Sequence, residues 1–396
     1  MKEKIVLGLS GGVDSSVAAF LLKEQGYEVI AVYMINWKDT TGTLSGACPY
    51  EEDVLIAELV ARKLGIPFHV VDLSDTYRRQ VVDYMFEEYA RGRTPNPDVL
   101  CNREIKFDAF LQTAQKFGAG KIATGHYCRC DSVSIGDGKV YYRLLAGRDK
   151  NKDQSYFLCQ LSQKQLSRAV FPIGELDKGR VRELAEELGL ASAQKKDSQG
   201  ICFVGKVDLP VFLQQKLGSK KGRILEVPAY FKAYHRSYPE DPEERIKKQA
   251  RPYFYRASDG VLVGEHQGAH FYTVGQRKGL HVGGTEKPLY VLATDVENNL
   301  VFVGRGEEHP GLFRKALRIN HQEVHWVRPD LALKTGESAD YSVRIRYRQA
   351  LQPAHLHCFE DALYIAFEEE QRSIVAGQFA VWYRGDELLG SGVISA

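Results

Sequence analysis

The chain has 396 residues, and 53 Lys and Arg against 51 Asp and Glu give a formal net charge of +2. At about 100–200 residues per domain, this length predicts two or three domains. The composition is that of an ordinary globular protein, and the near-neutral charge neither indicates nor excludes nucleic acid. No stretch approaches the roughly 20 apolar residues of a membrane span, and the N-terminus lacks a signal-peptide core. We therefore expect a cytoplasmic protein whose seven cysteines form no disulfide framework.

The first 125 residues alternate strand-like and helix-like segments. Strands are expected at 5–9, 27–34, 68–73 and 121–125, and helices at 15–25, 51–65, 76–91 and 103–117. This alternation predicts an α/β fold with a doubly wound, mainly parallel sheet and helices on both faces. Residues 126–147 alternate polar and apolar side chains around "GDGK", which is typical of a hairpin, and a helical pattern returns at 177–190.

The second half of the chain has a different character. Residues 216–251 hold ten Lys and Arg against five Asp and Glu, together with several prolines and tyrosines. From about residue 288 the pattern consists of short strands separated by turns, which predicts a small antiparallel β-barrel. We expect a catalytic domain at 1–203, a small connecting domain at 204–286 and a C-terminal barrel at 287–396.

The loop "LSGGVDSS" (9–16) directly follows the first expected strand. Its glycines allow a sharp turn and close approach of the backbone to a ligand, and amides at the start of the next helix favour an anion. The loop lacks the lysine of the common GxxxxGK[ST] phosphate loop. Asp14 would suit a phosphate site only if a divalent cation such as Mg²⁺ bridged the two. The alternative is a tight turn that holds no ligand.

Cys101 lies in "RTPNPDVLCNREIKF". Pro95 and Pro97 are expected to keep this segment in a loop, and Asn102 is expected to cap a helix that begins near Arg103. A cysteine beside a helix N-terminus tends toward a lowered pKa, so a reactive thiolate is expected at Cys101.

Cys202 lies in "KKDSQGICFVG", where Lys195 and Lys196 are expected to favour its thiolate. Asp98, three residues before Cys101, is a candidate base or positioning acid. Taken alone, each cysteine is better explained as a buried packing residue, because a cytosolic cysteine is more often that than a nucleophile.

The loop resembles the SGGxDS loop of the PP-loop ATP pyrophosphatases. The segments "SGGVDSS", "RTPNPDVLCNREIKF", "ATGHY", "KDQSYFL", "DSQGICFVG" and "YTVGQRKGL", in this order over nearly the whole chain, resemble the bacterial tRNA-specific 2-thiouridylases. The resemblance implies a PP-loop domain like those of the adenine nucleotide alpha hydrolases. It also implies ATP-dependent replacement of the 2-oxygen of the wobble uridine by sulfur in tRNAs for lysine, glutamate and glutamine, with release of AMP and pyrophosphate.

The same resemblance assigns roles to individual residues. Catalysis is assigned to Asp98, Cys101 and Cys202. ATP binding is assigned to Gly8, Leu9, Ser10, Gly11, Gly12, Val13, Asp14 and Ser15, with Met34 and Gly125 on the adenine side. Asn96, Pro97 and Asp98 are assigned to the target base. The rest of the tRNA is assigned to His126, Lys152, Asp153, Gln154, Arg346, Tyr347 and Gln378.

The implied sulfur chemistry passes through both thiols. A cysteine desulfurase or a sulfur relay protein would load Cys202 as a persulfide. Either this persulfide attacks the activated base directly, or Cys101 attacks it and frees sulfide. Both routes can end in a Cys101–Cys202 disulfide that a reductant reopens. The target base must leave its stack to reach such a site.

One segment departs from the compact form of the family. Residues 228–256 are longer and rich in tyrosine, proline and charge, and we expect them to add tRNA affinity, although donor docking and a neutral insertion stay open. Other hypotheses are a PP-loop ligase or amidotransferase and a non-catalytic RNA-binding nucleotide sensor. A thiol redox protein is disfavoured because Cys101 and Cys202 lie far apart in the chain.

Overall fold

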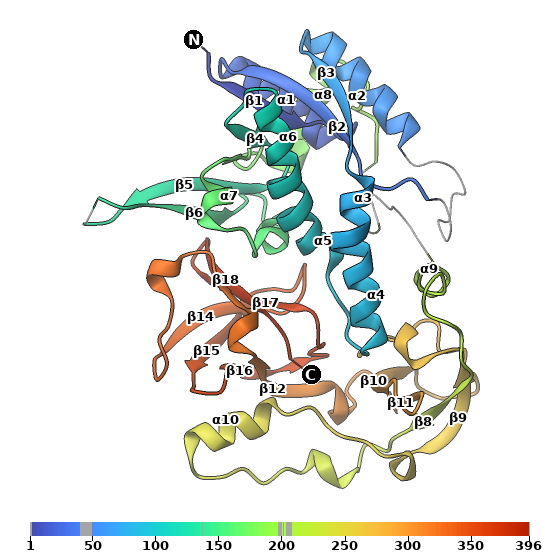
Figure 1. Ribbon diagram of the computed structural model, residues 1–396. Helices are drawn as coiled ribbons and strands as arrows, with labels where there is room; N and C mark the ends of the chain where they lie inside the picture. Colours follow the sequence, from blue (N-terminus) through green and yellow to red (C-terminus); the bar gives the residue numbers. More distant parts are fainter. Residues whose placement is uncertain are drawn as a thin grey trace.

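The computed structural model describes residues 2–39, 50–136, 138–196, 200, 202 and 208–395. Its helices are α1 Val13–Glu24, α2 Glu51–Leu64, α3 Ser74–Tyr77, α4 Asp83–Ala90, α5 Pro97–Leu100, α6 Phe110–Lys116, α7 Gln163–Leu166, α8 Lys178–Glu187, α9 Leu209–Leu213 and α10 Pro242–Ala250. Two π-helical segments, Arg78–Val82 and Cys101–Ala109, join α3 to α4 and α5 to α6. Figure 1 shows the N-terminal layer at one end and α10 at the other.

The N-terminal part is built on a parallel sheet of five strands: β1 Lys4–Gly8, β2 Glu28–Ile35, β3 Phe68–Asp72, β4 Lys121–Ala123 and β7 Ala169–Val170. Alternate residues of β1 face opposite layers, as the period of two in a strand requires. Ile5 and Leu7 pack with α1, α2 and α8, whereas Val6 packs with Phe110 and Ala114 of α6. The predicted doubly wound fold with helices on both faces is confirmed.

The strand order β3-β2-β1-β4-β7 reverses direction between β1 and β4. In open α/β sheets, ligands bind outside the carboxyl ends of the strands at such a switch point. The loop after β1 is the segment "LSGG", and the loop after β4 begins at Thr124. The topology therefore brings the glycine-rich loop and Gly125 to one crevice.

The helix that carries Cys101 begins six residues earlier than expected. Asn96 caps it by accepting a hydrogen bond from the Val99 amide at 3.3 Å, and Pro97 is its first residue. Proline suits that position because its missing N–H needs no partner there and its φ is already helical. The expected cap by Asn102 is wrong: its side-chain amide donates to the Asp98 and Phe157 carbonyls instead.

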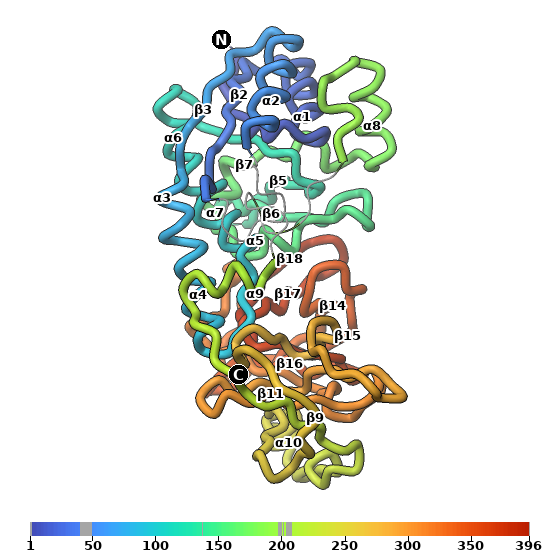
Figure 2. Tube along the Cα trace, turned by 90° about the vertical axis from the view of Figure 1, so that its right-hand side faces the viewer, coloured from blue at the N-terminus to red at the C-terminus, as the bar shows by residue number. Residues whose placement is uncertain are grey.

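A large antiparallel sheet lies below the parallel sheet and extends from the middle of the molecule into its lower part (Figure 1). Its strands are β5 Cys128–Ser134, β6 Val140–Ala146, β12 Phe313–Ile319, β13 Val324–Trp326, β14 Ser338–Arg344, β15 Gln352–Cys358, β16 Leu363–Arg372, β17 Phe379–Arg384 and β18 Glu387–Val393. The predicted hairpin at 126–147 is therefore confirmed as β5–β6, and it extends the C-terminal sheet: Leu144 of β6 pairs with Leu388 of β18. Figure 2 shows the layers stacked along the long axis of the molecule.

A separate four-stranded sheet has the order β10-β11-β8-β9, with β8 Gly222–Glu226, β9 Val261–His266, β10 Leu289–Asp295 and β11 Leu300–Arg305. The expected limit between 286 and 287 cuts this sheet, because β11 pairs with β8 from Leu300↔Arg223 onward. Backbone pairing across the expected limit means that strands 289–305 belong with the connecting domain. We therefore place the limit of the C-terminal barrel between Arg305 and Phe313.

The close contact between Gly125 and α1 gives a test of this fold. A Cβ at Gly125 would lie 2.7 Å from the Ser15 amide nitrogen, so Gly125→Ala has to displace the first turn of α1. We expect a loss of about 1–3 kcal/mol in the free energy of unfolding, measured by urea titration without nucleotide. Gly120→Ala is the matched control, since a Cβ there meets nothing within 4 Å. Equal stability of the two variants would contradict this packing.

Candidate active site

The glycine-rich loop is held by its own serines. Ser15 Oγ accepts from the Ser10 amide at 3.2 Å and donates to the Gly12 carbonyl at 3.1 Å. Gly11 has φ of +74°, and a Cβ there would lie 2.4 Å from the Asp53 carbonyl oxygen of α2. Gly12 is the N-cap of α1 and makes no side-chain cap hydrogen bond. The first turn of this 12-residue helix thus presents amides that no side chain caps, which is the setting that favours an anion.

A lysine from another part of the chain lies beside this loop. Lys178, at the start of α8, contacts both carboxylate oxygens of Asp14 at 2.7 and 2.9 Å. The Tyr127 hydroxyl donates to the same carboxylate at 2.7 Å. The loop therefore gains from α8 the positive charge that its own sequence lacks.

This arrangement corrects the expectation for Asp14. Its two oxygens already receive the Lys178 ammonium and the Tyr127 hydroxyl, so the carboxylate does not fit a metal in this geometry. Within the described ranges, no group of three or more His, Cys, Asp or Glu side chains could hold a metal ion. In this arrangement Lys178 neutralises the acid beside the phosphate loop.

Met34 contacts the end of β1, and Gly125 contacts the start of α1. A Cβ at Gly8 would lie 3.2 Å from Met34 Cε, so the end of β1 touches the Met34 side chain at the end of β2. Gly125 touches the first turn of α1 from the β4 side. Both residues therefore lie at the carboxyl ends of strands that flank the switch point.

The two cysteines singled out in the sequence meet in space. The Cys101 thiol hydrogen-bonds the Cys202 sulfur, and both cysteines are free. Asp98 Oδ1 accepts a hydrogen bond from the Cys202 amide at 3.0 Å, and the Tyr77 hydroxyl donates to the Cys202 carbonyl at 2.7 Å. The main chain at Cys202 is therefore held on both sides, next to Cys101. The remainder of "DSQGICFVG" other than Gly200 lies outside the described residues.

The thiol with the lowered pKa is Cys202, not Cys101. The hydrogen bond from Cys101 is the largest influence that lowers the pKa of Cys202, and the Lys106 ammonium lowers it further. Burial raises the pKa of Cys101, and the hydrogen bond with Cys202 raises it further. The thiol lies in the second turn of the helix, away from the N-terminal amides that were expected to lower its pKa. Burial also raises the pKa of Asp98, against the hydrogen bond from Cys202.

The expected source of positive charge at Cys202 also needs correction. Lys195 pairs with Asp53 of α2, the residue whose carbonyl touches Gly11, so its charge lies near the phosphate loop. The ammonium near Cys202 is that of Lys106, which lies on the π-helical segment that begins at Cys101. The segment "LCNREIKF" contains this lysine five residues after Cys101. An α-helical spacing would not bring residues five apart together, whereas the spacing of a π-helix does.

The C-terminal barrel holds the segment that precedes the helix. Gln378 donates from Nε2 to the carbonyls of Thr94 and Pro95 at 3.0 and 3.1 Å. The Thr94 amide donates to the Ala376 carbonyl at 2.9 Å. Gly377 has φ of +91°, and a Cβ there would lie 2.8 Å from the Thr94 oxygen. Gln378 thus positions the loop that leads to Asn96, Pro97 and Asp98.

The residues assigned to other tRNA contacts divide into two groups. His126, Asp153 and Gln154 make contacts within the protein. His126 is buried, with Nδ1 at 2.7 Å from Thr124 Oγ1. Asp153 is buried, pairs with Arg344 and accepts from the Ser155 amide at 3.0 Å. Gln154 Oε1 accepts from the Tyr127 amide at 3.0 Å. His126 and Asp153 are buried, Gln154 is half-buried, and all three have partners inside the protein, so we infer that they support the loops.

The second group stays open to solvent. Arg346 is exposed, and Tyr347 is half-buried with its ring centroid 4.3 Å from that of Phe157. Lys152 is half-buried at the start of the same loop as Asp153. These three residues remain candidates for contact with a large polar ligand.

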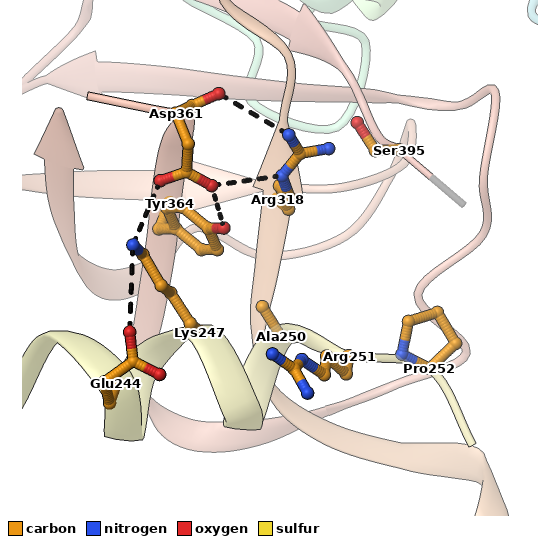
Figure 3. A pocket seen from close by; sticks show the side chains of 9 residues that line it. All are labelled: Glu244, Lys247, Ala250, Arg251, Pro252, Arg318, Asp361, Tyr364 and Ser395. Atoms are coloured by element: carbon orange, nitrogen blue, oxygen red, sulfur yellow. Dashed lines mark hydrogen bonds and ion pairs between the residues drawn. The ribbon is translucent and has the colours of Figure 1, made fainter. Parts of the chain in front are cut away.

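A hollow of about 510 Å³ lies far from the thiols, between α10 and strands β12 and β16 (Figure 3). Lys247 of α10 contacts Asp361 at 3.3 Å, and Asp361 also accepts from the Tyr364 hydroxyl at 2.7 Å. Arg318 lies 3.8 Å from the same carboxylate. These contacts hold α10 against the barrel. Lys247 and Arg318 compensate the charge of the Asp361 carboxylate in the hollow.

Comparisons with known proteins agree with this organisation. Family models match residues 3–206 as a tRNA methyl transferase HUP domain, 243–305 as a tRNA methyl transferase PRC-barrel domain and 316–394 as an aminomethyltransferase beta-barrel domain. No helix among the described residues is both long and apolar enough to cross a membrane.

Curated relatives match the chain along its whole length. A tRNA-specific 2-thiouridylase MnmA of Flavobacterium johnsoniae is 57% identical, over 99% of this chain and 100% of the relative. Proteins of the same name from Christiangramia forsetii and Karelsulcia muelleri are 56% identical, over 99% of this chain and 100% of the relative, and 41% identical, over 100% and 99%. The chain therefore belongs to the family of tRNA-specific 2-thiouridylases.

Proposed function

We propose that this protein is a tRNA-uridine 2-sulfurtransferase that replaces the 2-oxygen of the wobble uridine by sulfur in tRNAs for lysine, glutamate and glutamine. The observation that carries the proposal is the pair of free cysteines, 101 positions apart in the chain, whose thiols are hydrogen-bonded beside an acid. Sulfur transfer needs one thiol that carries the sulfur as a persulfide and a second thiol that releases it. A reaction with a nitrogen nucleophile needs neither thiol.

The two halves of the site are joined through the loop after β4. Gly125 abuts Ser15 of the phosphate loop, and the next residue, His126, packs its ring 6.2 Å from that of Phe107. Phe107 follows Lys106 in the segment that carries Cys101. A target base placed beside the two thiols would thus lie on the same side of the loop after β4 as the phosphate loop.

ATP supplies the activation, because adenylation of the uridine oxygen converts a poor leaving group into AMP and releases pyrophosphate. The residues of this chain fit the phosphates through the uncapped first turn of α1 and the close turn at Gly11 and Gly12. Lys178 neutralises Asp14, so the carboxylate does not repel them. Met34 and Gly125 bound the adenine side of this crevice.

The thiols supply the sulfur. A protein persulfide, from a cysteine desulfurase or a relay protein, transfers its outer sulfur to Cys202. The Cys202 persulfide attacks C2 of the activated base, a C–S bond forms and the C–O bond to AMP breaks. Cys101 then attacks Cys202 Sγ, which cleaves the S–S bond, leaves sulfur on the base and forms the Cys101–Cys202 disulfide. Asp98, with its raised pKa, is suited to hold a proton during these steps.

The two matched families whose descriptions mention methyl transfer suggest a rival activity. Methyl transfer to RNA would require a methyl donor, and it would not use a phosphate loop joined to paired thiols. Sulfur transfer accounts for the phosphate loop, the thiol pair and the acid at once. The reduced state that these thiols need also supports the proposed cytoplasmic location.

The long segment at 228–256 supports an added contact with tRNA. Three of its aromatic side chains are strongly exposed: Tyr230 by 82%, Phe254 by 75% and Tyr238 by 44%. Arg251 and Arg256, on either side of Phe254, are exposed as well. Aromatic faces beside arginines are typical of surfaces on which unpaired bases stack.

The first prediction concerns the reaction itself. With ATP, magnesium, a persulfide source and unmodified glutamate tRNA, wild-type protein should form 2-thiouridine, detected by mass after digestion to nucleosides. Cys101→Ser and Cys202→Ser should each reduce product formation by roughly a thousandfold or more, since each removes a covalent participant. Product from Cys202→Ser with free sulfide would limit that cysteine to sulfur delivery. No product with any tRNA, despite ATP turnover, would refute the proposal.

A second prediction concerns Lys178. Lys178→Met should weaken ATP binding, measured by calorimetry, by about tenfold or more, because Asp14 is left without its cation beside the phosphates. Adding Asp14→Asn should restore part of the affinity. Lys164→Met, on the exposed face of α7, is the charge-matched control. If the double variant binds as weakly as Lys178→Met, the role of Lys178 is not to compensate Asp14.

A third prediction concerns the 228–256 segment. Its deletion would also remove the packing of Ala250 on Ala316 and the hydrogen bond from Arg314 to the Ala250 carbonyl, so point substitutions are the sharper test. Phe254→Ala should cost about 1–3 kcal/mol of tRNA binding, and Arg251→Gln should lower the salt slope by about 1. Arg62→Gln on α2, at the opposite end of the molecule (Figure 1), is the control. Unchanged tRNA affinity at matched low salt would exclude this contact.

A further inference from the structure

Lys106 lies at the centre of the thiol site, and the proposed reaction assigns it no step. It belongs to the π-helical segment Cys101–Ala109, in which the Phe110 amide bonds to the Ile105 carbonyl five residues earlier. In a π-turn, residues five apart lie on nearly the same face, so Lys106 comes beneath Cys101. Such turns are rare and are frequent at functional sites.

The side chain of Lys106 reaches the sulfur of Cys202. It hydrogen-bonds that sulfur, and Cys101 and Asp98 also lie within range of its charge. Burial alone would lower the pKa of a lysine, yet these three acidic groups raise it, so the ammonium stays charged. The half-buried ammonium of Lys106 thus faces Cys202, which is the thiol of the pair with the lowered pKa.

The other groups around Cys202 cannot supply this charge. Tyr77 is buried, which raises its pKa and keeps its hydroxyl neutral. His126 lies near Lys106, and burial followed by that ammonium lowers its pKa, so its imidazole is neutral. Asp98 would destabilise a second negative charge, and the Cys101 thiol, which donates a hydrogen bond to the Cys202 sulfur, carries no positive charge. Among the residues that the structure describes around Cys202, Lys106 is the cation.

We propose that Lys106 is a catalytic residue that holds the Cys202 sulfur as an anion, first as the thiolate that accepts sulfur and then as the persulfide that delivers it. The inference rests on the proposed function. In the loading step the Cys202 thiolate attacks the outer sulfur of a donor protein persulfide. The new S–S bond forms at Cys202, the donor S–S bond breaks, and the donor cysteine leaves as a thiolate. No net oxidation occurs, and the lysine keeps its proton throughout.

The test measures Cys202 directly, without tRNA or ATP. Reduced protein is alkylated with iodoacetamide over a range of pH, and the rate at Cys202 is read by peptide mass spectrometry. Lys106→Met should move the midpoint of the Cys202 profile to higher pH by about one unit, so labelling at pH 7 should fall about tenfold. Lys106→Arg should restore most of the wild-type profile. Lys164→Met should leave it unchanged.

The possible results distinguish a failure of the proposed role of Lys106 from a failure of the proposed function. An unshifted profile in a folded Lys106→Met protein, checked by circular dichroism, would overturn the role of Lys106 even if the variant still thiolates tRNA. A shifted profile that Lys106→Arg restores would support it even if wild-type protein fails to thiolate any tRNA, which would refute the proposed function alone. Should Lys106→Met not fold, Lys106→Gln replaces it with the same two outcomes.

Discussion

The hydrogen bond from the Cys202 amide to the Asp98 carboxylate is the contact on which the chemistry of this protein depends. It joins segments 104 residues apart and brings the two thiols together. Because the bond occupies one oxygen of Asp98, it also opposes the rise in the pKa of that acid. Acid, thiol pair and lysine therefore form one electrostatic unit, in which a change at any member alters the others.

Two lysines from distant parts of the chain neutralise acids at the phosphate loop. The loop itself carries an acid and no cation, and the compensating ammonium of Lys178 arrives from a helix 164 residues away. Lys195 neutralises Asp53, whose carbonyl touches Gly11. A loop that holds pyrophosphate only until it departs benefits from cations that lie beside it and not within it.

Hydrophobic periodicity predicted the elements of the parallel sheet well, because alternating and helical patterns follow directly from which faces are buried. The glycines and serines after β1 likewise predicted a phosphate loop. Other features depend on partners that are distant in the chain. The Lys178–Asp14 pair, the pairing of β8 with β11 and the junction of β6 with β18 have no local signal.

Local signals were also misjudged at the thiol site. Pro97 is expected to break a helix, but proline at the first helical position favours one, so the helix begins at Pro97 and Cys101 lies in its second turn. Lys106 stands in the same quoted segment, but an α-helical spacing would not align it with Cys101. Only the wider π-turn makes that pairing visible.

The continuity of β6 with β18 has a mechanical consequence. A hairpin of the ATP-binding part is hydrogen-bonded into the sheet of the barrel, and Asp386 adds ion pairs to Arg129 and Lys150 at 2.7 Å each. Together with the Gln378 contact, this seam joins the parallel-sheet layer to the barrel layer that carries Arg346. Any movement of the barrel relative to the parallel-sheet layer would have to break these backbone hydrogen bonds and ion pairs.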